Sequence, residues 1–257
     1  MTWLRFEIAA CLFALQFLTR IPIPAAVTFS ESRFAAAPRY YPLVGGLIGV
    51  LCAGVLWAAG TVLPWALAVI LSIAAGALLT GAFHEDGLAD TFDGIGGGVT
   101  KDKALLIMKD SRIGTYGGLA LLLAIGAKAA SLTSMPVTIA FLSLVAAHSL
   151  SRLSSLVVIA TANYQRGEGT AKPVSDGISL AALAAGASFA AFCALPLVWT
   201  FGASPLGYGL CGLVTGHILM RAIVEPKIGG YTGDTLGGVQ QLSELGFYCG
   251  IAAWLSH

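Results

Sequence analysis

The chain has 257 residues, of which 57% are hydrophobic and 11% charged, whereas soluble globular domains carry about 25% charged residues. This composition excludes a water-soluble monomer. Lys and Arg number 14 against 13 Asp and Glu, so the net charge is only +1 and no broad basic field favours nucleic acid as a partner.

Apolar runs long enough to cross a bilayer recur along the chain. A bilayer core of about 30 Å needs about 20 mainly apolar helical residues. Eight segments fit: Glu7–Leu18, Leu43–Gly60, Leu63–Phe83, Thr115–Leu132, Pro136–Ala160, Ile178–Thr200, Pro205–Val224 and Leu236–Leu255. The first is short and contains Glu7 and Gln16, so it either spans, re-enters or lies in the interface. We predict a single all-α domain over residues 1–257, a polytopic transmembrane bundle with seven or eight segments.

The connections between these segments alternate in charge. The even-numbered ones, around Thr61, Ser134 and Gly202, are short and contain no Lys or Arg. The odd-numbered ones are long and basic, with Arg20, Arg33, Arg39, Lys101, Lys103, Lys109, Arg112, Arg166, Lys172, Arg221 and Lys227. Because cytoplasmic loops carry the excess of Lys and Arg, we expect the odd-numbered connections in the cytoplasm. Eleven of the 13 acidic residues lie in them as well, which places the active-site loops on the cytoplasmic side.

The densest polar motif follows the third segment and reads His84-Glu85-Asp86-Gly87-Leu88-Ala89-Asp90-Thr91-Phe92-Asp93-Gly94. On a helix, Asp86, Asp90 and Asp93 would share one face, because their spacing is i, i+4 and i+7. Mg²⁺ is commonly held by one or two carboxylates together with substrate phosphates. The motif therefore predicts a magnesium site, with a solvated acidic helix end as the alternative.

The glycine run Gly94-Ile95-Gly96-Gly97-Gly98 is expected to end this helix and to bring backbone N–H groups near a ligand. Lys109, Asp110 and Arg112 then precede the fourth segment, whose helix N-terminus would itself favour an anion. A phosphate-bearing ligand would explain both halves of this connection. Lys109 and Arg112 could instead be ordinary positive-inside anchors.

The last long connection, Lys227 to Gly238, is also glycine-rich and contains Asp234. Gln241 and Glu244 would line the same helix face as Asp234, and polar groups inside a membrane usually point toward a polar site. The alternative is that Glu244 only pairs with Arg152 or Arg221.

Other polar residues carry weaker indications. Arg20, in the rigid exit Thr19-Arg20-Ile21-Pro22, could bind a phosphate or anchor the chain at the interface. His84 is expected to support the acidic motif, and His148 to be a satisfied interior histidine. The five cysteines, which show no CxxC spacing, are expected to be small buried hydrophobic residues.

Four stretches, in this order, resemble the motifs of the cobalamin synthase family, the adenosylcobinamide-GDP ribazoletransferases. The similarity covers essentially the whole chain, and the stretches are Phe17 to Pro22, His84 to Gly94, Ile107 to Gly117 and Gly230 to Gly237. The resemblance implies a multi-pass, Mg²⁺-dependent enzyme of the bacterial cytoplasmic (inner) membrane. Such an enzyme joins adenosylcobinamide-GDP to α-ribazole or α-ribazole 5′-phosphate, releases GMP and forms adenosylcobalamin or its 5′-phosphate.

The family's acidic motif falls on Glu85, Asp86, Asp90 and Asp93, which become the expected catalytic residues. In the mechanism that we hypothesise, Asp86, Asp90 and Asp93 hold Mg²⁺ on the diphosphate, and Glu85 or one aspartate accepts the hydroxyl proton. The expected substrate-binding residues are Lys109, Asp110, Arg112, Arg20 and Asp234, with Asp234 as a candidate second-site ligand. The lipid bilayer surrounds the protein, and a homo-oligomer is compatible with the sequence.

Two other functions compete with this one. A lipid-head-group phosphotransferase of the CDP-alcohol type would share Asp86-Gly87-Leu88-Ala89, but Asp90 stands where such an enzyme would carry Arg. A membrane transporter would place charged or broken helices at the bilayer midplane, whereas the charges of this chain are predicted to gather at one face.

Overall fold

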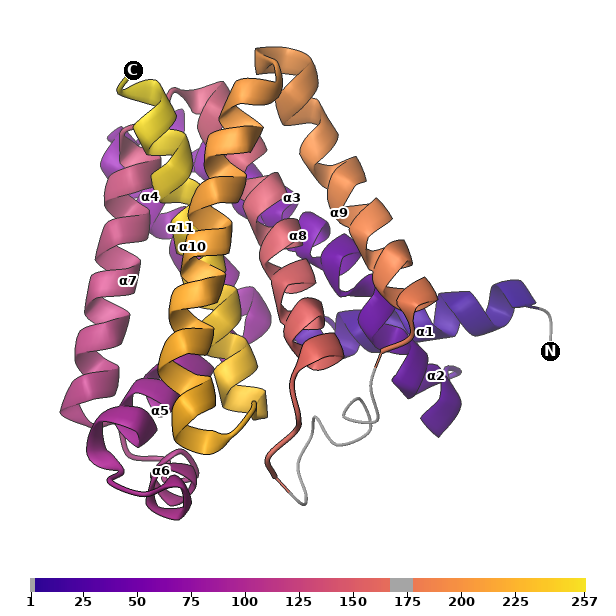
Figure 1. Cartoon of the computed structure of the whole chain (residues 1–257). Coiled ribbons are helices and arrows are strands. Elements are labelled where there is room, and N and C mark those ends of the chain that lie inside the picture. Colours follow the sequence, from indigo (N-terminus) through magenta and orange to yellow (C-terminus); the bar gives the residue numbers. More distant parts are fainter. Residues whose placement is uncertain (1–2, 167–177) are drawn as a thin grey trace.

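The computed structural model describes residues 3–166 and 178–257, and these residues form helices and no β-strand (Figure 1). The predicted all-α class is therefore confirmed. The elements are α1 (Trp3–Leu18), α2 (Glu31–Ala36), the 3₁₀ turn η1 (Ala37–Tyr40), α3 (Tyr41–Gly60), α4 (Trp65–Thr80), α5 (Phe83–Gly97), α6 (Lys101–Ile107), α7 (Thr115–Thr133), α8 (Val137–Thr161), α9 (Leu180–Phe201), α10 (Ala203–Ile228) and α11 (Gly233–Leu255).

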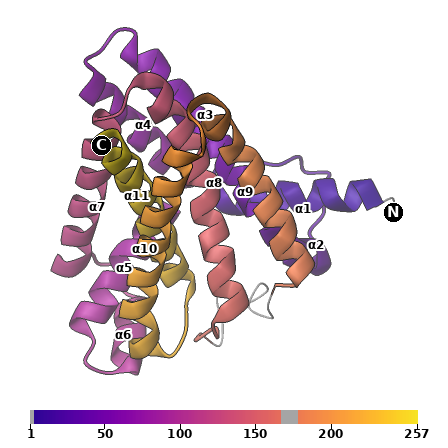
Figure 2. The same cartoon turned by 45° about the horizontal axis from the view of Figure 1, so that its top comes forward.

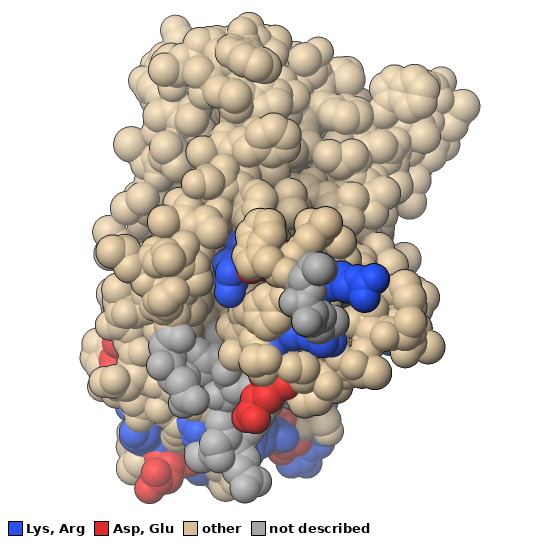
Figure 3. Space-filling view, turned by 90° about the vertical axis from the view of Figure 1, so that its right-hand side faces the viewer, with Lys and Arg blue, Asp and Glu red and all other residues tan. Residues whose placement is uncertain are grey.

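The long helices form a bundle around α8 and α11, the two helices with the most buried residues (Figures 1 and 2). The connections α7–α8 and α9–α10 lie at one end, whereas α5, α6 and the α10–α11 turn lie at the other. Two short connections without Lys or Arg therefore lie at the opposite end of the bundle from two long, basic ones, as the sequence predicts. Figure 3 shows charged side chains gathered in the lower half of one face, below an uncharged upper half.

Within the described ranges, five helical segments are long and apolar enough to cross a membrane: Glu31–Gly60, α7, α8, α9 and α10. A sixth is added if α4 and α5, which meet at 89°, count as one broken segment. These segments indicate a multi-pass membrane protein. Helix α1 has only 16 residues and crosses the direction of the bundle, and Gln240, Gln241 and Glu244 lower the hydropathy of α11. Seven or eight crossings therefore stay a prediction.

The acidic motif does not continue the third apolar segment but forms the separate helix α5 (Figure 1). Helix α4 ends at Thr80, and its C-cap Gly81 (φ 68°) and the next residue Ala82 (φ 57°) are both left-handed. These two consecutive residues produce the 89° bend between α4 and α5. Glycine adopts this conformation without strain, whereas alanine does so at a cost. The side chain of Arg20 lies directly against Gly81, where a β-carbon would overlap it.

The run Gly94 to Gly98 was expected to be too flexible to continue a helix, but α5 continues through Gly97 and ends only at the last glycines of the run. Its neighbours pack against these glycines: a β-carbon at Gly94 would overlap Met108, and one at Gly96 would come within 2.6 Å of the Tyr116 ring. Tertiary contacts with α6 and α7 therefore outweigh the low helix propensity of glycine.

The prediction that all five cysteines are buried is also wrong. Cys52 and Cys193 are buried, but Cys211 and Cys249 are exposed on the surface of the bundle. A membrane helix can be apolar on its outer face as well as its inner face, so an apolar run does not tell which way a cysteine points.

Glycines bring neighbouring helices into direct backbone contact. Helices α10 and α11 pack through Gly212 and Gly216 on one side and Gly246 and Gly250 on the other, a small-xxx-small arrangement on both helices. A β-carbon at any of the four would overlap a backbone carbonyl of the other helix. The expected close packing of the Val44 to Gly49 stretch is confirmed, because Gly45 and Gly49 touch backbone carbonyls of α8.

We expect Gly212→Ala to lower the free energy of unfolding by about 1–3 kcal/mol, because the methyl group would force α10 away from α11. Thermal unfolding in detergent measures the effect. Gly207→Ala, on the same helix with nothing within 4 Å of its β-carbon, is the matched control and should not destabilise the protein. Equal unfolding temperatures of the two variants would show that the close contact contributes nothing.

Candidate active site

Close packing between α5 and α11 assembles the candidate site. A β-carbon at Gly87 would lie 2.6 Å from the carbonyl oxygen of Asp234 and 3.2 Å from the Cα atom of Gly237. Only glycine allows this approach. It places Asp86 and Asp90, which flank Gly87 on α5, beside Asp234 in the first turn of α11.

We call Asp86, Asp90 and Asp234 the acidic cluster. Burial first, and then the charges of Asp86 and Asp234, together raise the pKa of Asp90 to about 7. Burial also raises the pKa of Asp234, against the lowering effect of Arg166, whose Nη2 donates to Asp234 Oδ2 at 2.6 Å. These groups lie at the polar end of the bundle, where α5 turns away from the apolar α4. Three neighbouring carboxylates with one guanidinium leave a net negative charge.

The residues present fit a magnesium ion. No group of three or more His, Cys, Asp or Glu among the described residues is arranged to hold a metal ion by itself. Mg²⁺ needs only one or two carboxylates when substrate phosphates and water complete its shell, and Asp86 and Asp90 can supply these. The excess negative charge around Asp90 is the kind of environment that a cation stabilises.

The carboxylate of Asp93 makes contacts in the structure other than those predicted for a metal ligand. It is buried, and its two carboxylate oxygens accept the N–H groups of Gly114 at 2.7 Å and Gly117 at 2.8 Å. The helix N-terminus that was expected to favour an anion is thus capped by the chain's own Asp93. Its role as a metal ligand stays a prediction, whereas its contact with α7 is observed.

The predicted phosphate-binding residues separate into two groups. Arg112 pairs with Asp110 on an exposed loop, with the two side chains 2.6 Å apart. This pairing holds the pKa of Asp110 below its ordinary value. Lys109 instead lines a pocket with Asp102, Gln165 and Arg166, and so lies on the side of the acidic cluster from which Arg166 approaches.

Arg166 is the main residue of the site that sequence reasoning did not include. It follows a short extended stretch in which Gln165 N–H donates to the Tyr231 carbonyl and Tyr231 N–H donates to the Asn163 carbonyl, each at 2.9 Å. These bonds attach the end of α8 to the glycine turn before α11, and so hold Arg166 beside Asp234. The only sequence signal was a basic residue in a long polar connection. Arg20, in contrast, lies at the α4–α5 turn, against Gly81.

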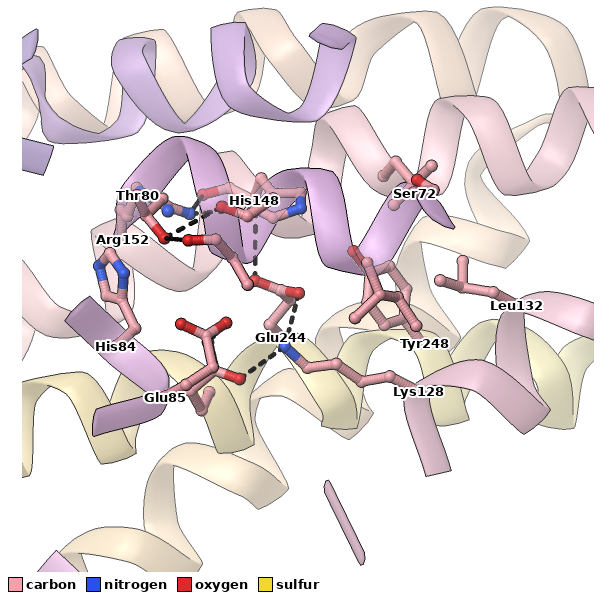
Figure 4. Close-up of a pocket in the computed structure, with 15 residues that line it drawn as sticks. Ser72, Thr80, His84, Glu85, Lys128, Leu132, His148, Arg152, Glu244 and Tyr248 are labelled. Carbon is pink, nitrogen blue, oxygen red and sulfur yellow. Dashed lines mark hydrogen bonds and ion pairs between the residues drawn. The ribbon is translucent and has the colours of Figure 1, made fainter. Parts of the chain in front are cut away.

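A second polar group is buried inside the bundle (Figure 4). Lys128 Nζ donates to Glu244 Oε1 and Gln241 Oε1, each at 2.7 Å, and His148 Nδ1 lies 3.4 Å from Glu244 Oε2. The alternative that Glu244 only pairs with Arg152 or Arg221 is wrong, because Lys128 reaches it from α7 while Arg221 pairs with Glu225. The interior position predicted for His148 is confirmed.

Glu85 points into this buried network rather than toward the acidic cluster (Figure 4). Its Oε1 accepts from Gln241 at 3.1 Å, and its Oε2 has no hydrogen-bond partner. The charges therefore do not all gather at one face as predicted, since Lys128 and Glu244 lie deep in the bundle with 4% exposure each.

Comparisons with known proteins agree with the four motifs. A family model described as cobalamin-5-phosphate synthase matches residues 10–252. A Leptothrix cholodnii protein named adenosylcobinamide-GDP ribazoletransferase is 44% identical over 252 residues, covering 95% of this chain and 93% of that protein. Proteins of the same name from Ralstonia pickettii and Shewanella frigidimarina are 43% and 41% identical, over 95% and 98% of this chain and 94% and 96% of their own lengths. No solved structure matches the chain. The resemblance is therefore confirmed, and the chain belongs to the cobalamin-5-phosphate synthase family.

Proposed function

We propose that the chain transfers the adenosylcobinamide phosphate moiety of adenosylcobinamide-GDP to a free ribose hydroxyl of α-ribazole or of α-ribazole 5′-phosphate, in a Mg²⁺-dependent reaction. The observation that carries this proposal is the 44% identity, over 95% of the chain, to a protein named for that reaction. The products are GMP and adenosylcobalamin or its 5′-phosphate. We place the protein in the cytoplasmic membrane with the acidic cluster facing the cytoplasm, because the basic connections lie at that end of the bundle.

In the proposed reaction, the oxygen of a free ribose hydroxyl of the acceptor attacks the phosphorus next to cobinamide. The new P–O bond forms as the bond to GMP breaks, the proton of the hydroxyl passes to a carboxylate, and the bonding electron pair leaves with GMP. Asp86 and Asp90 would hold Mg²⁺, which neutralises charge on the diphosphate when bound. Arg166 and Lys109 approach from one side and would bind phosphate oxygens of the leaving nucleotide.

The carboxylate that accepts the proton belongs, in this proposal, to the acidic cluster. Glu85 faces the buried network and is not placed to accept this proton, so one of the three aspartates of the acidic cluster takes that role. Asp234 is held by Arg166 and would orient the acceptor.

Release of GMP from adenosylcobinamide-GDP by the purified protein in lipid vesicles tests the function. We expect release only when α-ribazole and Mg²⁺ are both present, with one corrinoid product formed for each GMP. Turnover of a CDP-alcohol in place of adenosylcobinamide-GDP would favour the lipid-head-group reaction, and uptake of α-ribazole without GMP release would favour a transporter. Either result would contradict the proposal.

A further inference from the structure

A second cavity, which we call the aromatic pocket, adjoins the acidic cluster. It lies where α1, α3, α5, α8 and α11 meet, with Asp234 and Arg166 on one side and the buried His84 and Arg152 on another. Its volume is about 90 Å³, against about 20 Å³ for the cavity in the buried network. Because one water position needs roughly 10–15 Å³ on this measure, the pocket has room for a small flat ring and none for a corrin macrocycle.

Aromatic rings line this pocket and pack against one another. The rings of Phe17 and Tyr41 are stacked with centroids 5.6 Å apart and planes 5° apart, and Phe83 meets Phe17 edge-on at 5.5 Å. Tyr164 lines the pocket as well and contacts Tyr231 with centroids 5.4 Å apart. Flat aromatic surfaces that already hold one another in place suit a flat aromatic ligand, since little side-chain freedom is lost on binding.

The polar groups of the pocket are mainly hydrogen-bond donors. Arg152 and Arg166 both line it, and their Nε atoms are buried and have no hydrogen-bond partner among the described residues. Arg152 is only 2% exposed, so its unpaired N–H group is costly unless a ligand or water accepts from it. Among the described residues that line the pocket, the one carboxylate, Asp234, is already paired with Arg166. A ring that fits this pocket would therefore have a nitrogen that accepts a hydrogen bond and no N–H group that donates one.

On these grounds we infer that the aromatic pocket binds the benzimidazole base of the acceptor nucleoside, an assignment that rests on the proposed function. The base of α-ribazole is flat, largely apolar, and has one free ring nitrogen that accepts but does not donate. Guanine, the base of the other substrate, presents three N–H hydrogens on its polar edge and would leave them unpaired here. It fits the pocket that contains Asp102 and Lys109 better, on the other side of Arg166. A ribose next to the aromatic pocket would then lie beside the acidic cluster, with a free hydroxyl within its reach.

Steady-state kinetics of Phe17→Leu test the assignment. We expect the KM for α-ribazole to rise five- to tenfold, the effect of losing one aromatic stacking partner, with kcat and the KM for adenosylcobinamide-GDP changed less than twofold. Phe13→Leu is the matched control, because Phe13 lies one turn earlier on α1, packs against Phe29 and Phe34, and does not line the pocket. Equal KM values for α-ribazole in the two variants would overturn the assignment.

A second measurement uses the unaltered protein, so it does not depend on the folding of any variant. 1-Methylbenzimidazole, whose second ring nitrogen is substituted as in the nucleoside and cannot donate, should compete with α-ribazole and leave the KM for adenosylcobinamide-GDP unchanged. If the wild-type protein transfers but 1-methylbenzimidazole competes with adenosylcobinamide-GDP, or with neither substrate, the pocket assignment fails while the proposed function stands. If the wild-type protein neither binds α-ribazole in equilibrium dialysis nor releases GMP, the proposed function itself fails.

Discussion

Exchange of Asp90 for Asn is expected to lower the rate of transfer by about 10²–10³-fold, a typical cost of removing one preorganised electrostatic group from an active site. Asp90 is half-buried on α5 next to Asp86 and Asp234, and Asn keeps its shape while removing its charge. The change therefore removes a metal ligand or a proton acceptor without leaving a cavity. Single-turnover release of GMP at saturating substrate measures the effect.

Two further variants make this result specific. Glu31→Gln removes a carboxylate from the short helix α2, outside the acidic cluster, and should leave the rate unchanged. Asp93→Asn weakens the cap of α7, so we expect it to lower the free energy of unfolding by about 1 kcal/mol. A rate for Asp90→Asn within threefold of the wild type would remove Asp90 from the chemistry.

Replacement of Lys128 by Met is expected to lower the free energy of unfolding by about 3–5 kcal/mol, because it leaves the carboxylate of Glu244 buried without its ammonium partner. Both side chains are 5% exposed and 2.7 Å apart. Gln240 still donates to Glu244 at 2.6 Å, but a neutral amide does not balance the charge. Unfolding in detergent, followed by circular dichroism, measures the loss.

The double variant Lys128→Met with Glu244→Gln distinguishes a charge effect from a packing effect. Because it removes both charges together, most of the stability should return, whereas a packing defect would persist. Lys103→Met, on the exposed surface of α6, is the control and should change the stability by less than about 0.5 kcal/mol. A loss below 1 kcal/mol for Lys128→Met would show that the pair does not stabilise the bundle.

The arrangement of the acidic motif was only partly predictable from residues close together in the sequence. Its spacing predicted that Asp86 and Asp90 lie one turn apart on a helix, and α5 confirms this. The same spacing placed Asp93 with them, but the N–H groups that Asp93 accepts come from Gly114 and Gly117, more than 20 residues further along the chain. Helical periodicity gives the direction in which a side chain points, but it does not tell which residues of other helices lie in that direction.

The buried network shows the same limit. The ion-pair partners considered for Glu244, as the alternative to a polar site, were Arg152 and Arg221, whereas the cation that pairs with it is Lys128. Nothing in the sequence near Lys128 marks it as inward-facing, because the apolar residues of α7 surround it on all sides and its partner lies 116 residues away. Arg166 was missed for a similar reason: its place beside Asp234 depends on two backbone hydrogen bonds to Tyr231.

The sequence by itself determined the helical class, the positions of the long apolar helices, the alternation of basic connections and the family, because each of these depends on composition or on residues close together in the chain. Only the tertiary structure decided which carboxylates meet, which cation neutralises Glu244 and where the aromatic pocket lies. Those features depend on close approach between distant helices, such as Gly87 against Asp234 and Gly212 against Gly246. Such contacts are set by the packing of the whole bundle, since a helix can present any of its faces to a neighbour until the others are in place.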